Sequence, residues 1–201
     1  MLRLDVNLRD FNREVDKLSD FERNLNPLPA KFQKLSAEIV LLRLFSLLED
    51  TLASMARKVV CKAQYLDGSN PVVLVTCPNV QSAESKMKQF GRTRIRYNLK
   101  WTRASEIKEN LKYVLDGNDN FVRTIDYHGS FIDELRRIRN RIAHNNHQSR
   151  NNYQVVVRRY YGARLNGVTP GRLLMSTRHS PTLLWQYLAK SKILVKEVVK
   201  G

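Results

Sequence analysis

Apolar residues near the N-terminus recur at alternating steps of three and four residues, and this spacing limits the fold more than any other feature of the chain. Such a period places side chains on one face of an α-helix, whereas a half-buried strand alternates at every second residue. Asn26-Pro27 interrupts the pattern, and Pro29 reinforces the break. The spacing predicts one long helix within residues 1–28, whose apolar stripe is Leu4, Leu8, Phe11, Val15, Leu18 and Leu25.

A second stripe with the same period predicts a helix over residues 37–63, with Ser36 as its N-cap. We expect the two helices to pack on each other as an antiparallel pair. The buried face of the second helix would comprise Leu41, Leu44, Phe45, Leu48, Leu52, Met55, Ala56 and Val59.

The rest of the chain also favours helices over strands. The apolar run 71–78 has no evident partner strand, so we expect it to be irregular, and 165–171 reads as a turn. We therefore predict an all-α helical bundle in a single domain over residues 1–201, with the N-terminal helix packed alongside a main bundle at 36–201. Further helices are predicted at about 82–90, at 102–117, around 153–161 and after Ser180-Pro181. Another helix is predicted to begin at a capping box formed by Ser130 and Asp133. Its apolar stripe would be Phe131, Leu135, Ile138 and Ile142.

The charge of the chain points to a polyanionic partner. Lys and Arg number 35 against 19 Asp and Glu, which gives a net charge of +16 and a pI near 10.1. Phosphate contacts in nucleic-acid complexes are made mainly by Lys and Arg, so RNA or DNA is the favoured partner. An anionic membrane surface is a weaker alternative, and a basic, solvated surface is the simplest one.

The sequence also predicts a cytoplasmic protein without a membrane span, metal or cofactor. The most apolar run, 39–48, is too short to cross a membrane and contains Arg43. Cys61 and Cys77 form no disulfide framework, and no signal peptide is evident. Zinc sites typically have CxxC or HxxxH spacings, and the chain contains neither.

A basic segment with interleaved aromatic residues, GRTRIRYNLKW, occupies positions 91–101. Such a segment can contact RNA through phosphates and base stacking. A solvated connecting loop would have the same composition, and the sequence does not decide between the two.

The segment RRIRNRIAHNN at 136–146 places Arg139 and His144 near the end of a predicted helix. On an ideal helix, five residues separate two side chains by about 140° and by a rise of about 7.5 Å. The two side chains therefore do not share one helical face. Either the helix ends before His144, or a second copy of the chain completes the site.

The residue types suit RNA cleavage. Histidine exchanges protons near neutral pH, and arginine holds a phosphate with two hydrogen bonds while stabilising its developing charge. Together they would let an RNA 2′-hydroxyl attack its own phosphate without a metal, with Asn140 orienting the phosphate or the histidine. The ordinary alternative is a solvated basic helix end.

The motif RNRIAHNN resembles the signature of the HEPN superfamily, with Arg139, Asn140 and His144 at the motif positions. The run LLRLFSLLEDTLASM is similar to the family's early core helix with its acidic residue, here Glu49 or Asp50. The stretches LKWTRASEIKENLKYVLD and HGSFIDELRRIRNRIAH, the YYG segment and the Tyr-rich last helix resemble the RiboL-PSP-HEPN branch. The likeness covers most of 36–201.

The resemblance implies a small helical domain that forms a homodimer and acts as a metal-independent endoribonuclease. Such proteins are toxins of toxin–antitoxin pairs or anti-phage defence effectors, so an antitoxin or defence-system protein is an expected partner. His144 would then be the general acid or base and Arg139 the phosphate ligand. The alternative within the family is a non-catalytic module that binds RNA, nucleotide or a protein. A DNA-binding regulator lacks an evident recognition helix.

Other residues are expected to support this site. Glu49 or Asp50 would pair with Arg139 and orient it, although a simple structural ion pair is equally consistent with the sequence. The further RNA-binding candidates, each with a solvated surface position as the alternative, are Arg136, Arg137, Arg141, His147 and Arg150.

Overall fold

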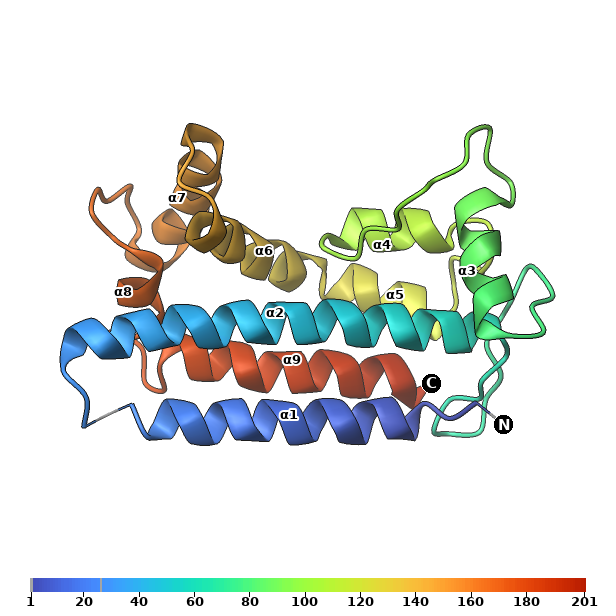
Figure 1. Ribbon diagram of the computed structural model, residues 1–201, viewed down its shortest axis with the longest axis horizontal. Coiled ribbons are helices and arrows are strands. Elements are labelled where there is room, and N and C mark those ends of the chain that lie inside the picture. The colour runs from blue at the N-terminus through green and yellow to red at the C-terminus, as the bar shows by residue number, and fades with distance from the viewer. Residues whose placement is uncertain (1, 26) are drawn as a thin grey trace. The chain divides into compact units, whose positions relative to one another are not determined.

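The computed structural model describes residues 2–25 and 27–201. In this part of the chain every regular element is a helix, and the β-structure is limited to one isolated bridge, which confirms the predicted all-α class. None of the helices described is long and apolar enough to cross a membrane. The helices are α1 (Asp5–Arg23), α2 (Ala30–Val60), α3 (Val80–Gln89), α4 (Ala104–Leu111), α5 (Asn120–Tyr127), α6 (Gly129–Ala143), α7 (His147–Tyr161), α8 (Pro170–Leu174) and α9 (Leu183–Lys200) (Figure 1).

The chain divides into two compact units, each assembled from segments distant in sequence. Unit 1 comprises residues 2–12, Leu48–Ile132 and Lys192–Gly201. Unit 2 comprises Arg13–Leu47 and Asp133–Ser191. The RNRIAH motif therefore belongs to unit 2, and the basic connector 91–101 belongs to unit 1.

The predicted packing of the N-terminal helix on the second helix is confirmed in unit 1. Phe11 of α1 is buried, and Asn7 donates a hydrogen bond from Nδ2 to Ser54 Oγ of α2 over 3.0 Å. Lys58 of α2 donates from Nζ to Asn7 Oδ1 over 2.6 Å. Apolar burial thus drives the pairing, and polar bonds at its edge align the two helices.

The predicted start of the second helix at residue 37 is wrong. The helix α2 begins at Ala30, directly after Pro29, and Ser36 lies inside it rather than at its N-cap. The carbonyl oxygen of Pro29 accepts from the backbone nitrogens of Phe32 and Gln33 over 2.8 and 3.1 Å. Proline favours this position because its fixed φ suits the first turn of a helix and its missing N–H is not needed there.

The predicted helix 102–117 also ends early, at Leu111. The following residues leave the helix because their backbone pairs with the apolar run 71–78. Leu74 N donates to Val114 O over 3.0 Å, and Val73 and Leu115 form the isolated antiparallel bridge. The run 71–78 therefore has a backbone partner that its sequence did not reveal.

The short helix α5 was not predicted, and it changes the start of α6. Asp119 caps α5, since its Oδ1 accepts from Phe121 N over 2.9 Å and from Tyr65 Oη over 2.5 Å. The next helix begins at Gly129, only one residue after α5 ends, so Ser130 lies within α6 and the predicted Ser130/Asp133 capping box is wrong.

Three further elements, α7, α8 and α9, differ from the prediction. The helix α7 begins at His147, several residues earlier than expected, and the predicted turn at 165–171 contains the start of the short helix α8. The last helix α9 begins at Leu183 rather than directly after Pro181. Thr182 caps it by accepting from Trp185 N over 3.2 Å.

Candidate functional site

The motif histidine lies in a turn between two helices of unit 2. The helix α6 ends at Ala143 and α7 begins at His147, so His144 stands outside both. Its backbone nitrogen still donates to Asn140 O over 2.9 Å, while its side chain is exposed. Of the two arrangements that the spacing allowed, the structure therefore shows a helix that ends before His144.

Local hydrogen bonds fix the shape of this turn. Asn146 caps α7, because its Oδ1 accepts from Ser149 N over 2.8 Å. The buried hydroxyl of Ser149 donates back to His144 O over 2.5 Å and also lies 2.9 Å from Asn146 O. A capped helix start that binds the carbonyl of the preceding turn limits the motion of that turn.

Arg139 is held on α6 by groups that carry no charge. Its guanidinium lies over the ring of Phe45, 5.7 Å from the ring centre, and its Nη1 donates to Asn140 Oδ1 over 3.2 Å. A cation over an aromatic face is oriented by the ring quadrupole and keeps its full positive charge. Asn140 thus orients Arg139 here, whereas the sequence suggested that it orients the phosphate or the histidine.

Arg141 and Arg150 converge on a single amide oxygen. Arg141 Nη1 and Arg150 Nη2 donate to Asn145 Oδ1 over 2.8 and 2.9 Å. Arg150 is exposed and Arg141 is half-buried. Among the residues that the structure describes, the recorded ion pairs do not involve Arg139, Arg141 or Arg150. Within the described residues, the hydrogen-bond acceptors of these three guanidinium groups are therefore neutral amide oxygens.

The remaining basic candidates occupy different surroundings. Arg136 and Arg137 are half-buried on α6, so they are less accessible than a solvated basic face requires. His147 is exposed at the first position of α7, with Nδ1 3.3 Å from Asn151 Nδ2. Of these three, His147 is the side chain most open to a ligand beside the turn.

The two acidic candidates lie on the part of α2 that belongs to unit 1. Asp50 is exposed and lines a cavity of about 290 Å³ together with Arg57, Glu84 and Tyr97. Glu49 is half-buried on the same helix. Because Arg139 belongs to unit 2, its pairing with either carboxylate stays a prediction.

Glu134 links α6 to α7 and α9, a role that its position in the sequence did not predict. Its buried carboxylate accepts from Arg159 Nη1 and Tyr160 Oη of α7, each over 2.7 Å, and from Tyr187 Oη of α9 over 2.5 Å. Burial raises the pKa of Tyr160 to about 12, so this phenol stays protonated and remains a donor. The available signal was a carboxylate within the apolar stripe, one residue before Leu135.

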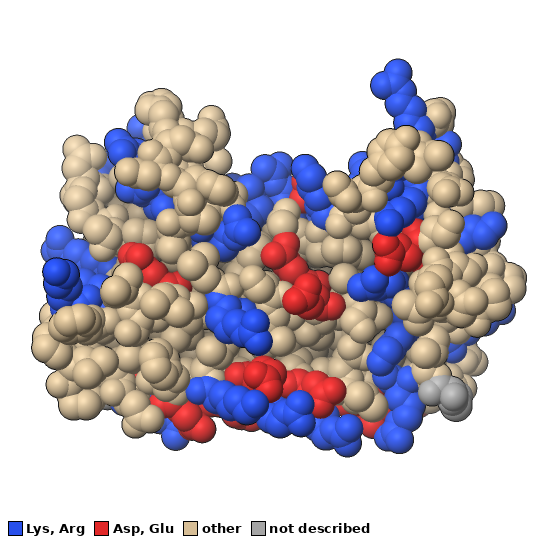
Figure 2. Space-filling model, in the orientation of Figure 1, with Lys and Arg blue, Asp and Glu red and all other residues tan. Residues whose placement is uncertain are grey.

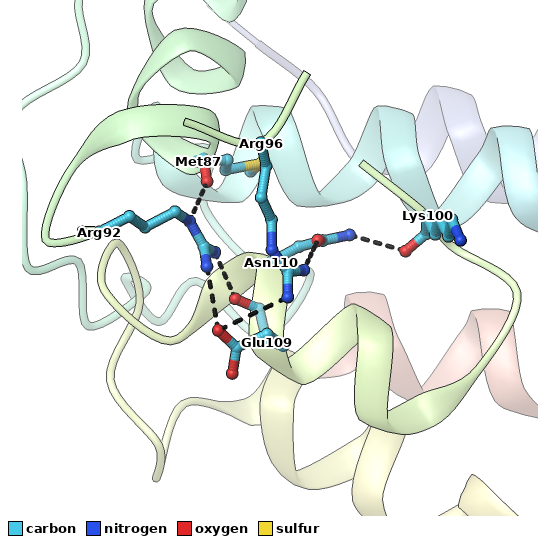
Figure 3. Close-up of polar contacts among 6 residues, drawn as sticks. All are labelled: Met87, Arg92, Arg96, Lys100, Glu109 and Asn110. Carbon is cyan, nitrogen blue, oxygen red and sulfur yellow. Dashed lines mark hydrogen bonds and ion pairs between the residues drawn. The ribbon is translucent and has the colours of Figure 1, made fainter. Parts of the chain in front are cut away.

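The basic connector 91–101 is anchored by two of its arginines (Figure 3). Arg92 donates from Nε to Met87 O over 2.8 Å, from Nη1 to Glu109 Oε1 over 3.0 Å, and to Glu109 O. Arg96 donates from Nη1 to Asn110 Oδ1 over 3.2 Å, with Nη2 3.8 Å from Glu109 Oε1. These two arginines therefore fasten the connector to α4.

Other side chains of the connector face solvent. Arg94 is exposed, and Tyr97 retains 81% of its accessible surface. The connector arches between α3 and α4, and a basic side chain projects from that region in the space-filling view (Figures 1 and 2). Arg92 and Arg96 thus fit the interpretation of this segment as a structural connector. Arg94 and Tyr97 fit the interpretation as an RNA contact, because their side chains are exposed.

Within residues 2–25 and 27–201, no three His, Cys, Asp or Glu side chains cluster closely enough to hold a metal ion. No family model, curated protein or solved structure matches this chain. The resemblance to the HEPN superfamily accordingly stays a prediction carried by the motif residues themselves.

Proposed function

We propose that this chain is a metal-independent endoribonuclease of HEPN type that cleaves RNA at the turn between α6 and α7. The observation that carries the proposal is the composition of this turn. Exposed His144 directly precedes Asn145, whose amide oxygen accepts from Arg141 and Arg150, and the amide of Asn140 accepts from Arg139, so neutral groups orient these cations. A phosphate needs fixed cations, and transfer of the 2′-hydroxyl proton needs a group that titrates near neutral pH.

The proposed reaction is an internal transesterification. A general base removes the proton of an RNA 2′-hydroxyl, and the 2′-oxygen attacks the adjacent phosphorus. The bond from phosphorus to the 5′-oxygen breaks, and a general acid protonates that oxygen. The products are a 2′,3′-cyclic phosphate and a 5′-hydroxyl. His144 serves as acid or base, and Arg139 stabilises the charge on the non-bridging oxygens.

The proposal includes a homodimer, in which Arg139 and His144 of both protomers share one cleft. An apolar stripe on the unit 2 part of α2 supports self-association. Phe32, Leu35 and Ile39 recur at helical spacing and keep 55%, 55% and 57% of their surface exposed. Exposed apolar side chains in such a row mark surfaces that are covered by a partner.

The cellular role follows from the resemblance alone. We infer a cytoplasmic toxin or anti-phage defence effector, restrained or triggered by an antitoxin or another defence-system protein. RNA is the substrate, and neither a cofactor nor a metal is part of the proposed reaction.

The test is cleavage of a labelled single-stranded RNA in EDTA by the wild type, Arg139→Ala and His144→Ala. We expect only the wild type to cleave, and His144→Ala to keep most of its RNA affinity because a phosphate contacts the arginines. Arg9→Ala, which removes an exposed arginine from α1, is the matched control and should cleave normally. Equal cleavage by all four proteins would place the activity elsewhere.

The rival is a non-catalytic module that binds RNA, nucleotide or a protein partner. The same arginine–asparagine arrangement favours it as well, since phosphate binding requires no histidine. If this rival holds, His144→Ala has no effect in cells, while charge reversal at Arg136, Arg137 and Arg141 abolishes function.

A further inference from the structure

A second basic site lies in unit 2, in a cavity of about 500 Å³ formed by the start of α2, the end of α7, α8 and the loops beside α8. We infer that this cavity binds the phosphate group of a nucleotide. Its residues lie outside the RNRIAH motif, so the inference goes beyond the proposed cleavage of RNA and does not depend on it.

The charges that line the cavity are all of one sign. Lys34, Arg172 and Arg178 line it, and none of the described lining residues is acidic. Like charges in one concave site repel one another, and a phosphate dianion replaces that repulsion by attraction. Lys and Arg side chains gather at the left edge of Figure 2, where α8 lies in Figure 1.

Close packing of α8 on α2 brings two of these cations together. A side chain at Gly171 would collide with the backbone carbonyl of Lys34, so the two backbones approach as only glycine allows. Gly171 N donates to Glu38 Oε1 over 2.7 Å, so this carboxylate of α2 is bound to the backbone of α8. Thr169 caps α8 by accepting from Arg172 N over 3.2 Å.

The third cation is held by an aromatic ring. The guanidinium of Arg178 lies over the ring of Tyr161, 5.0 Å from its centre. Gly162 ends α7 there with a φ of +76°, and Gln154 Nε2 donates to Leu165 O over 3.2 Å to fix the start of the next loop. As with Arg139 over Phe45, the ring orients the cation and leaves its charge available.

The size and the remaining lining groups define the ligand class. A volume of about 500 Å³ lies in the usual range of about 300–1,000 Å³ for small-molecule sites. Ser176 and Thr177 contribute hydroxyls, and Asn166 contributes an amide. Arginine, lysine and hydroxyl groups recognise phosphate oxygens, and apolar Val168 and Met175 leave room beside them for a nucleoside. The phosphate is either that of a free nucleotide or that at the 5′ end of an RNA.

The test is calorimetric titration of the Arg139→Ala/His144→Ala protein, which lacks two groups of the proposed cleavage site, with AMP, with ATP, and with short RNAs that carry a 5′-phosphate or a 5′-hydroxyl. Arg172→Gln/Arg178→Gln in the same background should weaken binding at least about tenfold, the scale of a lost charge-assisted hydrogen bond. Arg9→Gln/Arg123→Gln removes the same charge from exposed positions outside unit 2 and should change binding less than about twofold. Thermal melts of all variants serve as the control for folding.

The different ligands in this titration distinguish a free nucleotide from the 5′ end of an RNA as the source of the phosphate. Tight binding of AMP or ATP identifies a free nucleotide, and preference for the 5′-phosphorylated RNA identifies an RNA end. If none of these ligands binds, or if the control pair weakens binding as much as Arg172→Gln/Arg178→Gln, the inference is overturned. Wild-type RNA cleavage is measured separately, so failure of the nuclease proposal leaves this result intact and the reverse also holds.

Discussion

Two segments of this chain have similar basic sequences and opposite electrostatic roles. In the connector 91–101, Arg92 and Arg96 lie against the carboxylate of Glu109. In the turn after α6, Arg141 and Arg150 bind the neutral amide of Asn145. A carboxylate cancels the charge of an arginine, whereas an amide oxygen orients the guanidinium and leaves its charge in place. We therefore expect the acceptor, rather than the number of arginines, to decide which segment attracts a phosphate.

Replacement of Arg92 should have the largest effect on stability. The Arg92 side chain is only 6% exposed, and its loss leaves Glu109 and two backbone carbonyls without their donor. We expect Arg92→Ala to lower the free energy of unfolding by about 3 kcal/mol, measured by urea denaturation. Exposed Arg94→Ala is the control and should stay within about 0.5 kcal/mol of the wild type. Equal effects of the two substitutions would remove the distinction between anchored and free arginines.

Glu134→Gln tests the buried carboxylate that links α6 to α7 and α9. The substitution keeps the shape but weakens the bonds from Arg159, Tyr160 and Tyr187. We expect a loss of about 2 kcal/mol in the free energy of unfolding, together with slower RNA cleavage because α6 and α7 lose a fixed relation. Asp20→Asn on α1, whose exposed carboxylate forms a surface ion pair with Arg23, is the control and should stay within about 0.5 kcal/mol of the wild type. Unchanged stability would show that Glu134 does not anchor α6.

Asn145→Asp replaces the neutral acceptor of the turn by a carboxylate, which is the kind of acceptor that Glu109 provides in the connector. A carboxylate between Arg141 and Arg150 should cancel charge without unfolding the helix ends. We expect RNA affinity to fall about tenfold, and the salt dependence of binding to weaken by about one counterion. Exposed Asn70→Asp changes the net charge equally and should have little effect. A similar loss in both variants would mean that RNA senses only net charge.

Two equally exposed tyrosines test the free part of the connector. Tyr97 and Tyr127 each keep 81% of their surface. If the connector contacts single-stranded RNA, Tyr97→Ala should weaken binding by about 1 kcal/mol, as loss of one base stack does. Tyr127→Ala should leave affinity unchanged in the same fluorescence anisotropy assay. Equal results for both would assign the connector to the fold alone.

The sequence predicted the long helices well because their apolar stripes are strong local signals. The all-α class and the packing of α1 on α2 were confirmed. The end of α4 was missed because 114–116 pair with 72–74, a contact between residues distant in sequence. The helices α5 and α8 are too short to show a period.

The site was predictable only in part, because several of its contacts join residues that are distant in the sequence. The motif itself, with Arg139 and His144, stands in a continuous stretch of sequence. The role of Asn145 and the anchoring of Arg92 on Glu109 depend on which acceptor the folded chain places beside each arginine. The cavity lined by Lys34, Arg172 and Arg178 is formed by segments distant in the sequence, so no local sequence pattern predicts it.

The most direct test of the central claim is the chemistry of the RNA ends, read by mass spectrometry after incubation in EDTA. We expect 2′,3′-cyclic phosphate and 5′-hydroxyl ends with the wild type, and neither with His144→Ala. Ends that carry a 3′-hydroxyl and a 5′-phosphate, or the same products from His144→Ala, would contradict cleavage by the turn between α6 and α7.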